Sequence, residues 1–144
     1  MANNLVATAS VSINASRDRV WDALTDPEII ARYMFGSRVT SDWKIGSPIT
    51  YAGEYEGKEY EDHGTILEVK PGELLRSTHF SPLSGKPDLP ENYHTITYTL
   101  DAQPHGMHLE LSQDNNSSEA EVEHSAANWQ QMLDSLKTVV ESTP

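Results

Sequence analysis

Apolar and polar residues alternate at the start of the chain. The apolar positions are Leu5, Ala7, Ala9, Val11 and Ile13. A period of two places the larger apolar side chains on one face of a β-strand. The pattern therefore predicts a half-buried strand over residues 5–13.

Two short helices are predicted next. Ser16 is suited to cap the first, in which apolar residues at positions 20, 21 and 24 share one face. Asp26-Pro27-Glu28 has the features of a second helix start, because Asp accepts free amide hydrogens, Pro fits the first helical position and Glu favours the positive end. Apolar residues at 29, 30, 33 and 34 would form the buried face of that helix.

Short alternating runs, separated by turn residues, follow between residues 37 and 113. They lie at 39–43, 47–55, 60–69, 74–80, 95–102 and 107–113. Runs of this length and period predict five or six antiparallel strands. Residues 81–92 are broken by prolines and predict one long loop, long enough to cover an opening.

The last segment predicts one long helix of about six turns. Ser118 and Glu121 have the spacing of a capping box. The apolar stripe that follows repeats at steps of four and three and consists of Val122, Ala126, Trp129, Leu133, Leu136 and Val140. We expect this stripe to pack against the sheet.

The order of these elements predicts an α+β fold, with a curved antiparallel sheet wrapped around the C-terminal helix. Two short helices follow the first strand. A helix touches only part of a concave surface, so space should remain between helix and sheet. We expect a single domain over residues 1–144, because a chain of this length buries roughly two-thirds of its surface on folding.

Several motifs resemble one known family. The stretch from Ile13 to Glu28, INASRDRVWDALTDPE, resembles the opening of domains related to the activator of Hsp90 ATPase (AHSA1-type), in the START/Bet v1-like (SRPBCC) superfamily. WKIGS at 43–47, GTILEVKP at 64–71 and Asn128-Trp129 support it, although Asn128 stands where relatives more often have glycine. The resemblance implies a helix-grip fold. It leaves function open, since the superfamily includes ligand carriers, polyketide cyclases and dehydratases, and co-chaperone domains.

Composition and charge narrow the partners. The 144 residues are 37% hydrophobic, contain no cysteine and have a formal net charge of −12. That charge argues against binding to nucleic acid or to membrane surfaces, because both are negatively charged. The start lacks the pattern of a signal peptide and no apolar run approaches a membrane span, so we expect a cytoplasmic protein.

The usual catalytic and metal motifs are missing. His105 and His108 have a spacing that suits a metal on a helix, but here they span a turn and a strand, so we expect two exposed histidines and no metal. Neither a G-x-S-x-G elbow nor a glycine-rich phosphate loop occurs. We therefore assign no catalytic residue and no cofactor.

A group of acidic residues surrounds one predicted hairpin tip. Its members are Glu54, Glu56, Glu59, Glu61 and Asp62. Paired carboxylates can transfer protons or bind calcium. We interpret this group as a solvated edge that discourages pairing with other molecules.

The hairpin that turns at Pro71-Gly72 brings His63 and His79 near each other. A turn that pairs residue 69 with 74 places the two histidines on opposite faces. A three-residue loop that pairs residue 70 with 74 places both on the face of Leu67 and Val69. Because a shift of one residue turns every side chain over, the sequence leaves both registers open.

We expect a ligand cavity between the sheet and the last helix, because a mostly apolar cleft with a few polar groups is typical of a small-molecule site. The candidate lining residues are Tyr33, Phe35, Tyr51, Tyr55, His63, Leu67, His79, Tyr98, Leu100, Leu109, Trp129 and Leu133. The first hypothesis is a binding domain for a small hydrophobic or amphipathic molecule.

Two other functions remain open. One is an enzyme of the polyketide cyclase or dehydratase kind, in which His63 or His79 moves protons. The other is a co-chaperone type of interaction domain that uses the charged outer surface to bind a chaperone. Dimerisation is also left open.

Overall fold

One antiparallel sheet organises the fold. The computed structural model describes residues 5–34, 36–55, 57–82 and 85–142. Seven strands pair in the order β1-β7-β6-β5-β4-β3-β2. In chain order the elements are β1 (Ala7–Ile13), α1 (Arg17–Thr25), α2 (Pro27–Tyr33), β2 (Arg38–Ser41), β3 (Pro48–Tyr55), β4 (Lys58–Lys70), β5 (Leu74–His79), the 3-10 turn η2 (Pro90–Asn92), β6 (His94–Gln103), β7 (Gly106–Gln113) and α3 (Glu119–Ser142).

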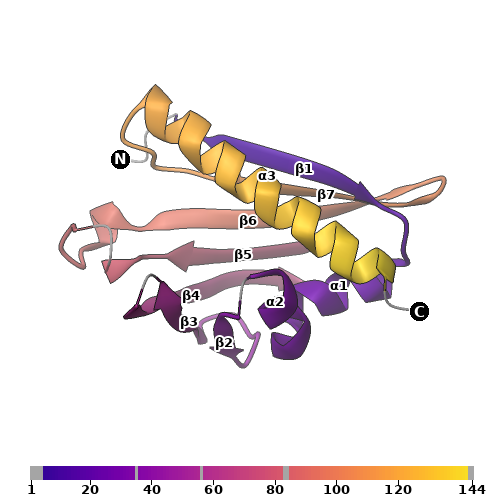
Figure 1. The fold of residues 1–144 in the computed structure, drawn as a ribbon, viewed down its shortest axis with the longest axis horizontal. Coiled ribbons are helices and arrows are strands. Elements are labelled where there is room, and N and C mark those ends of the chain that lie inside the picture. The colour runs from indigo at the N-terminus through magenta and orange to yellow at the C-terminus, as the bar shows by residue number, and fades with distance from the viewer. Residues whose placement is uncertain (1–4, 35, 56, 83–84, 143–144) are drawn as a thin grey trace.

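The arrangement is the helix-grip fold. Figure 1 shows α3 crossing one face of the sheet diagonally, with α1 and α2 near its C-terminal end and beside the β2 end of the sheet. We call this covered face the inner face. The α+β class, the order of elements and the two short helices predicted from the sequence are confirmed.

The predicted helix caps form. Ser16 Oγ accepts a hydrogen bond from the Arg19 amide at 3.3 Å, and Asp26 Oδ1 accepts one from the Glu28 amide at 2.9 Å. Ser118 Oγ accepts from the Glu121 amide at 3.1 Å. The return half of the capping box differs, because the Glu121 carboxylate accepts from Ser117 instead of Ser118.

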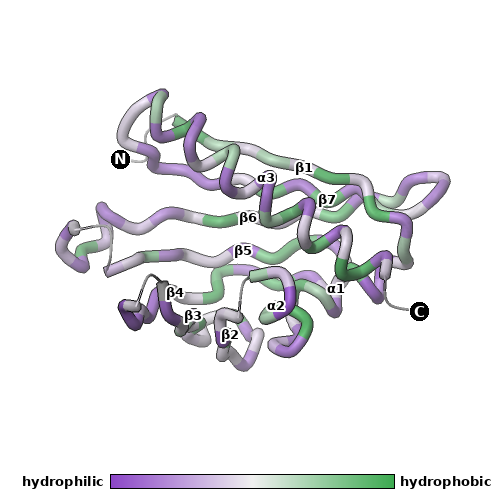
Figure 2. Tube along the Cα trace, in the orientation of Figure 1, coloured by the Kyte–Doolittle hydropathy of each residue, from purple (hydrophilic) through white to green (hydrophobic). Residues whose placement is uncertain are grey.

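Only the C-terminal half of α3 enters the core. Its buried residues are Met132, Leu133, Leu136 and Val140, and none of the residues before Met132 is fully buried. Leu109 and Leu111 of β7 are buried in the same hydrophobic cluster. Figure 2 shows hydrophobic stretches of β1, β5 and β6 where α3 passes over the sheet, and hydrophilic residues in the end loops. The N-terminal half of α3 therefore covers the sheet without filling the space beneath it.

Polar side chains of α3 hold the edge strand β1. Gln130 bonds the backbone of Ser10 twice, with Nε2 donating to its carbonyl at 2.9 Å and Oε1 accepting from its amide at 3.3 Å. Lys137 Nζ donates to the carbonyl oxygen of Ser12 at 2.7 Å. These bonds use backbone groups of β1 that β7 leaves unpaired, so α3 blocks this edge against another strand.

A β-bulge decides which face the β4 side chains take. The turn pairs Lys70 with Leu74, which is the second register considered above, but the pairing shifts between Ile66 and Glu68. Leu67 is the extra residue and is 42% exposed. The shift reverses the alternation for the rest of β4, so that His63 bridges to Phe80 and lies on the outer face. His63 and His79 therefore lie on opposite faces.

Gly64 allows β4 and β5 to approach closely beyond the bulge. A Cβ atom at this position would lie 1.7 Å from the carbonyl oxygen of Thr78.

Gly64→Ala should lower the free energy of unfolding by about 3 kcal/mol, because the strand backbones would have to separate. Gly57→Ala is the control, since that site is open and only its positive φ of +81° is strained, which costs about 1 to 2 kcal/mol. Urea unfolding measures both, and equal losses would contradict the steric explanation.

Candidate functional site

A pocket of about 260 Å³ lies between α3 and the inner face of the sheet, beside the chain that leaves α2. Its lining residues are Met34, Ser37, Tyr51, Glu54, Tyr60, Asp62, His79, Ile96, Tyr98, Trp129 and Met132. They come from β3, β4, β5, β6, α3 and the α2–β2 connection. The apolar and aromatic members form most of the wall, and the polar members gather on the side of β3 and β4.

The pairing of β3 with β4 places the polar side of the pocket. Tyr51 lies directly opposite Asp62, and Gly53 lies opposite Tyr60. The Tyr60 ring covers Gly53, where a Cβ atom would lie 2.7 Å from the tyrosine hydroxyl. The Tyr60 hydroxyl is hydrogen-bonded to Ser37 Oγ at 2.5 Å. This bond joins β4 to the segment after α2 and closes that side of the pocket.

Asp62 and His79 are joined by a hydrogen bond inside the site. His79 Nε2 lies 3.1 Å from Asp62 Oδ2, and the two side chains are 21% and 18% exposed. The His79 ring meets the Tyr51 ring edge to face, with 5.5 Å between ring centroids. Asp62 Oδ1 is buried and has no hydrogen-bond partner among the described residues. A buried acceptor without a donor is costly, so this oxygen marks a place where a bound molecule can donate a hydrogen bond.

Burial changes the acidity of the tyrosines around the pocket. Burial raises the pKa of Tyr51 to about 12, a hydrogen bond from Ser77 opposes the rise, and the charge of Asp62 adds to it. Burial also raises the pKa of Tyr98, and the neighbouring Tyr51 adds to that effect. Both hydroxyls are therefore neutral donors and acceptors at physiological pH.

Trp129 forms the α3 wall of the pocket and is held by a polar contact. Its indole N–H donates to the side-chain oxygen of Gln113, which is buried at the end of β7. The backbone carbonyl of Gln113 accepts a hydrogen bond from the side-chain amide of Asn116 at 3.0 Å. The indole is thus fixed from β7 and the following loop.

A second, polar hollow of about 790 Å³ adjoins the pocket and shares Asp62 and His79 with it. We call it the vestibule. Its other lining residues are Ser81, Lys86, Asn92, His94, Gln113, Glu121, His124, Ser125 and Asn128. The predicted long loop therefore contributes to its wall through residues 81, 86 and 92. The Asp62–His79 pair lies where the apolar pocket meets this polar space.

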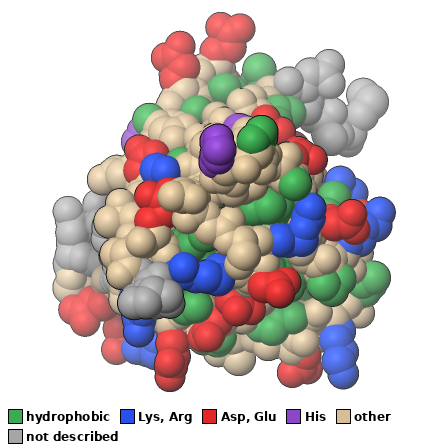
Figure 3. Space-filling model, turned by 90° about the vertical axis from the view of Figure 1, so that its right-hand side faces the viewer, with side chains coloured by type: hydrophobic (Ala, Val, Ile, Leu, Met, Phe, Trp, Pro, Cys, Tyr) green, Lys and Arg blue, Asp and Glu red, His purple; other side chains and the backbone are tan. Residues whose placement is uncertain are grey.

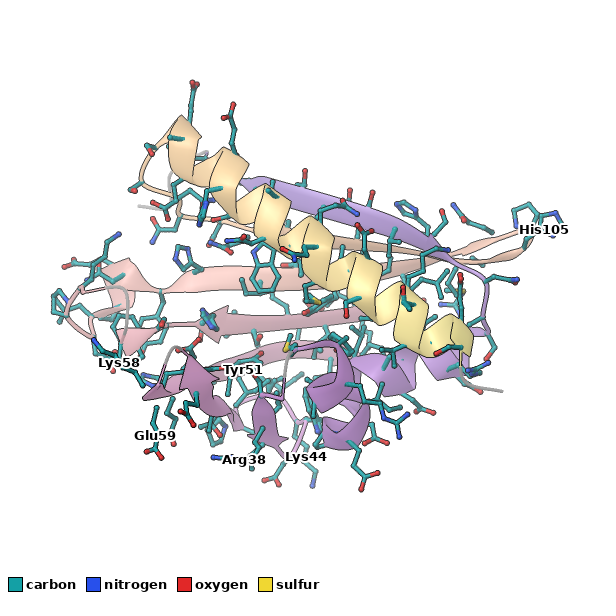
Figure 4. All side chains as sticks on the ribbon, viewed as in Figure 1. Arg38, Lys44, Tyr51, Lys58, Glu59 and His105 are labelled. Carbon is teal, nitrogen blue, oxygen red and sulfur yellow. The ribbon has the colours of Figure 1, made fainter. Side chains whose placement is uncertain are left out.

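Four of the predicted lining residues come together in the pocket: Tyr51, His79, Tyr98 and Trp129. Tyr51 is labelled in Figure 4, on β3 beneath the level of α3.

Four others lie in the core and do not line the pocket. They are Tyr33, Leu100, Leu109 and Leu133. Tyr33 is fully enclosed, and its hydroxyl donates to the Ala23 carbonyl at 2.6 Å. Burial raises its pKa well above the ordinary value. This tyrosine thus joins α2 to α1 instead of facing the pocket.

The bulge corrects two further expectations, because it turns His63 and Leu67 away from the inner face. His63 Nε2 lies 2.9 Å from Asp88 Oδ2 and 3.0 Å from the Tyr93 hydroxyl. Tyr93 also stacks on Phe80, with 5.2 Å between centroids. His63 therefore fastens the long loop to the outer face.

Two predicted residues remain without a described side chain. Phe35 lies outside the described residues, and Tyr55 ends β3 with its side chain outside the description.

Sequence reasoning missed the polar centre of the site. Asp62 was placed in a solvated acidic edge, yet it is mostly buried and faces the pocket. Glu54 does stay exposed at the pocket rim. The signal was present in β4, where Asp62 has the same parity as the glycine at 64 and the buried Ile66. If the alternation is instead counted back from Val69 and the bulge is ignored, Asp62 is assigned to the outer face.

The remaining sequence candidates lie away from the pocket. His105 is exposed at the tip of the β6–β7 hairpin, at the opposite end of the sheet from Lys58 (Figure 4). Figure 3 looks onto the hairpin end of the molecule, where acidic, basic and hydrophobic side chains are interspersed. Within the described ranges, no group of three His, Cys, Asp or Glu side chains is placed to hold a metal ion. No helix in the described chain is long and apolar enough to cross a membrane.

Comparison with known proteins identifies relatives of this fold. Residues 14–141 match the family described as Activator of Hsp90 ATPase homolog 1-like protein. The solution structure of ChR145 from Cytophaga hutchinsonii is 53% identical, with a TM-score of 0.86, over 99% of this chain and 97% of that one. No curated protein matches the sequence.

More distant structures share the fold alone. The Aha1 dimer from Colwellia psychrerythraea is 17% identical, with a TM-score of 0.73, over 94% of this chain and 96% of that one. DynU16, a protein of the dynemicin biosynthetic locus, is 19% identical, with a TM-score of 0.80, over 97% of this chain and 48% of that one.

The raised tyrosine pKa values predict a loss of stability at high pH. The pKa of Tyr51 rises from 10.0 to about 12 on folding, so the unfolded chain releases this proton at lower pH than the folded chain does. The stabilisation is fully present below pH 10 and is lost as pH rises towards 12. Over that interval, Tyr51→Phe should make the free energy of unfolding fall less steeply, by about 1.4 kcal/mol per pH unit. Urea unfolding at several pH values measures both slopes, and equal slopes would contradict the assignment.

Proposed function

We propose that this chain, which belongs to the family of Activator of Hsp90 ATPase homolog 1-like proteins, binds a small amphipathic molecule in the pocket. The observation that carries the proposal is a space of about 260 Å³ with a mostly apolar wall and an unpaired buried acceptor. A site of this kind suits a molecule with an apolar body and few polar groups.

The volume sets the size of the ligand. An apolar cavity of about 150 Å³ holds one benzene ring. The pocket is larger, so it accommodates a single ring with a chain of several atoms, or two fused rings. Ile96, Trp129 and Met132 would surround the apolar body. The polar end would lie near Asp62, from which the vestibule leads to solvent.

Replacing Trp129 should weaken binding more than it weakens the fold, because this side chain is only half buried and forms one wall. With 4-phenylbutan-1-ol as the probe, isothermal titration calorimetry of Trp129→Ala should give a dissociation constant at least about tenfold higher than wild type. Trp43→Ala is the matched control, since Trp43 is also half buried and lies outside the pocket lining. A similar loss in both variants would count against the pocket, and native mass spectrometry of the purified protein would identify any bound natural molecule.

A proton-transfer enzyme is the second candidate, and the Asp62–His79 pair favours it. In such an enzyme, the free Asp62 oxygen would accept a proton while His79 orients the carboxylate. DynU16, which shares the fold, belongs to a biosynthetic locus. Of the two histidines considered for this role, His63 lies on the outer face, so that His79 and the Asp62 carboxylate face the pocket. Chaperone binding stays a prediction of the family resemblance.

A test of this candidate uses 5-nitrobenzisoxazole, a two-ring probe of suitable size. A base removes the proton on C3 while the N–O bond breaks, and the product is a coloured cyanophenolate. Wild-type protein should accelerate this elimination over free acetate, and Asp62→Asn should lower the rate constant about a hundredfold. His79→Asn should lower it less, because the carboxylate remains. If Asp62→Asn keeps the wild-type rate, this side chain is not the base.

A further inference from the structure

We infer that the natural ligand carries a cationic amine, which Asp62 binds at the junction of the pocket and the vestibule. This inference rests on the proposed function, because it names the chemical class that the same pocket selects.

The charges of the lining point to a cation. Asp62 and Glu54 supply two carboxyl groups, and none of the described lining residues is a lysine or an arginine. An anionic ligand would meet these two carboxyl groups, and His79, the basic side chain among the described lining residues, already contacts Asp62. Like charges that meet in a partly desolvated site are strongly unfavourable.

The unpaired Oδ1 atom of Asp62 can accept a hydrogen bond from a ligand. His79 occupies Oδ2 at 3.1 Å, whereas Oδ1 is buried and has no partner within the described chain. An ammonium group has several N–H donors and a positive charge, so it can donate a hydrogen bond to the carboxylate oxygen and also neutralise its negative charge. Tyr51 is directly across the ladder from Asp62, and its raised pKa leaves a neutral hydroxyl that does not compete as an anion.

The aromatic walls favour the same ligand. Tyr51, Tyr60, Tyr98 and Trp129 all line the pocket. Aromatic rings attract a cation through their negative faces, and the attraction grows when water is excluded. A carboxylate beside such walls is a typical setting for recognition of an amine with an apolar body. Neutral alcohols could use the hydrogen bond to Oδ1, but they would gain nothing from the charges.

The vestibule is compatible with this orientation. Its basic residues, Lys86, His94 and His124, line the polar hollow and are absent from the pocket lining. Lys86 and His94 interact electrostatically with Glu121, whose pKa is lowered first by its hydrogen bond to Ser117 and also by these charges. On this side Lys86 therefore has a carboxylate partner in Glu121, at the start of α3. An amine entering from the vestibule meets Asp62, whose Oδ1 has no hydrogen-bond partner among the described residues.

Three probes with one shared body test the inference. They are 4-phenylbutylamine, 4-phenylbutan-1-ol and 4-phenylbutyrate, which share a phenyl ring on a four-carbon chain and end in a cationic, a neutral and an anionic group at pH 7. Calorimetric titration of wild-type protein should rank affinity as amine, alcohol, carboxylate, with about tenfold or more between the first two. Asp62→Asn keeps the shape of the side chain and removes its charge. It should weaken the amine about tenfold or more and leave the alcohol within about twofold.

Asp101→Asn is the matched control, because it changes the net charge equally at an exposed position outside the pocket. It should leave all three dissociation constants unchanged. If the alcohol or the carboxylate binds as tightly as the amine, or if Asp62→Asn does not affect the amine, the inference is wrong and the binding function stands. If none of the three probes binds and no natural molecule is found on the purified protein, the binding function itself fails.

Discussion

The structure depends on the contact of a straight helix with a curved sheet. α3 packs into the core only from Met132 onward, where Leu133, Leu136 and Val140 are buried. Towards its N-terminus the helix is held to β1 and β7 by polar side chains, and no residue before Met132 is fully buried. The space left there is bounded by Trp129 on one side and by β3 to β6 on the other. The same helix thus stabilises one half of the molecule and roofs a pocket in the other. Because two layers that meet along one line must separate elsewhere, the pocket is a consequence of the architecture.

The polar groups of the pocket are positioned by strand register. Tyr51, Asp62 and His79 come from three neighbouring strands, and they meet because the bulge at Leu67 sets the parity of the first half of β4. The outer face uses the opposite set of side chains, since His63 there holds the long loop through Asp88 and Tyr93. One extra residue therefore separates the chemistry of the pocket from the attachment of the loop.

Much of the fold follows from local patterns in the sequence. Period-two runs, the caps at Ser16, Asp26 and Ser118, and the α3 stripe predicted α1, α2, α3 and the places of the seven strands, whereas η2 lies in the predicted loop. The pocket could be predicted in kind, and Tyr51, Tyr98 and Trp129 were found by their faces. Asp62 was not, because the face assigned to it depends on whether the alternation is counted from Ile66 or from Val69, and only the pairing of β4 with β5 shows the bulge between them. Tyr33 was misplaced for a similar reason, because its hydroxyl partner is a backbone carbonyl of α1 that only tertiary packing provides.

The strand order also determines how late in synthesis the sheet can be fully paired. Each strand from β2 to β7 pairs with its neighbour in the chain, whereas β1 pairs only with β7, so that Ala7 meets Gln113. α3 then lies against β1 through Gln130 and Lys137. During synthesis on the ribosome, β1 stays unpaired until β7 has emerged. Its small and polar residues, Ala7, Thr8, Ala9 and Ser10, suit that delay, because they give a nascent chain little surface for premature association.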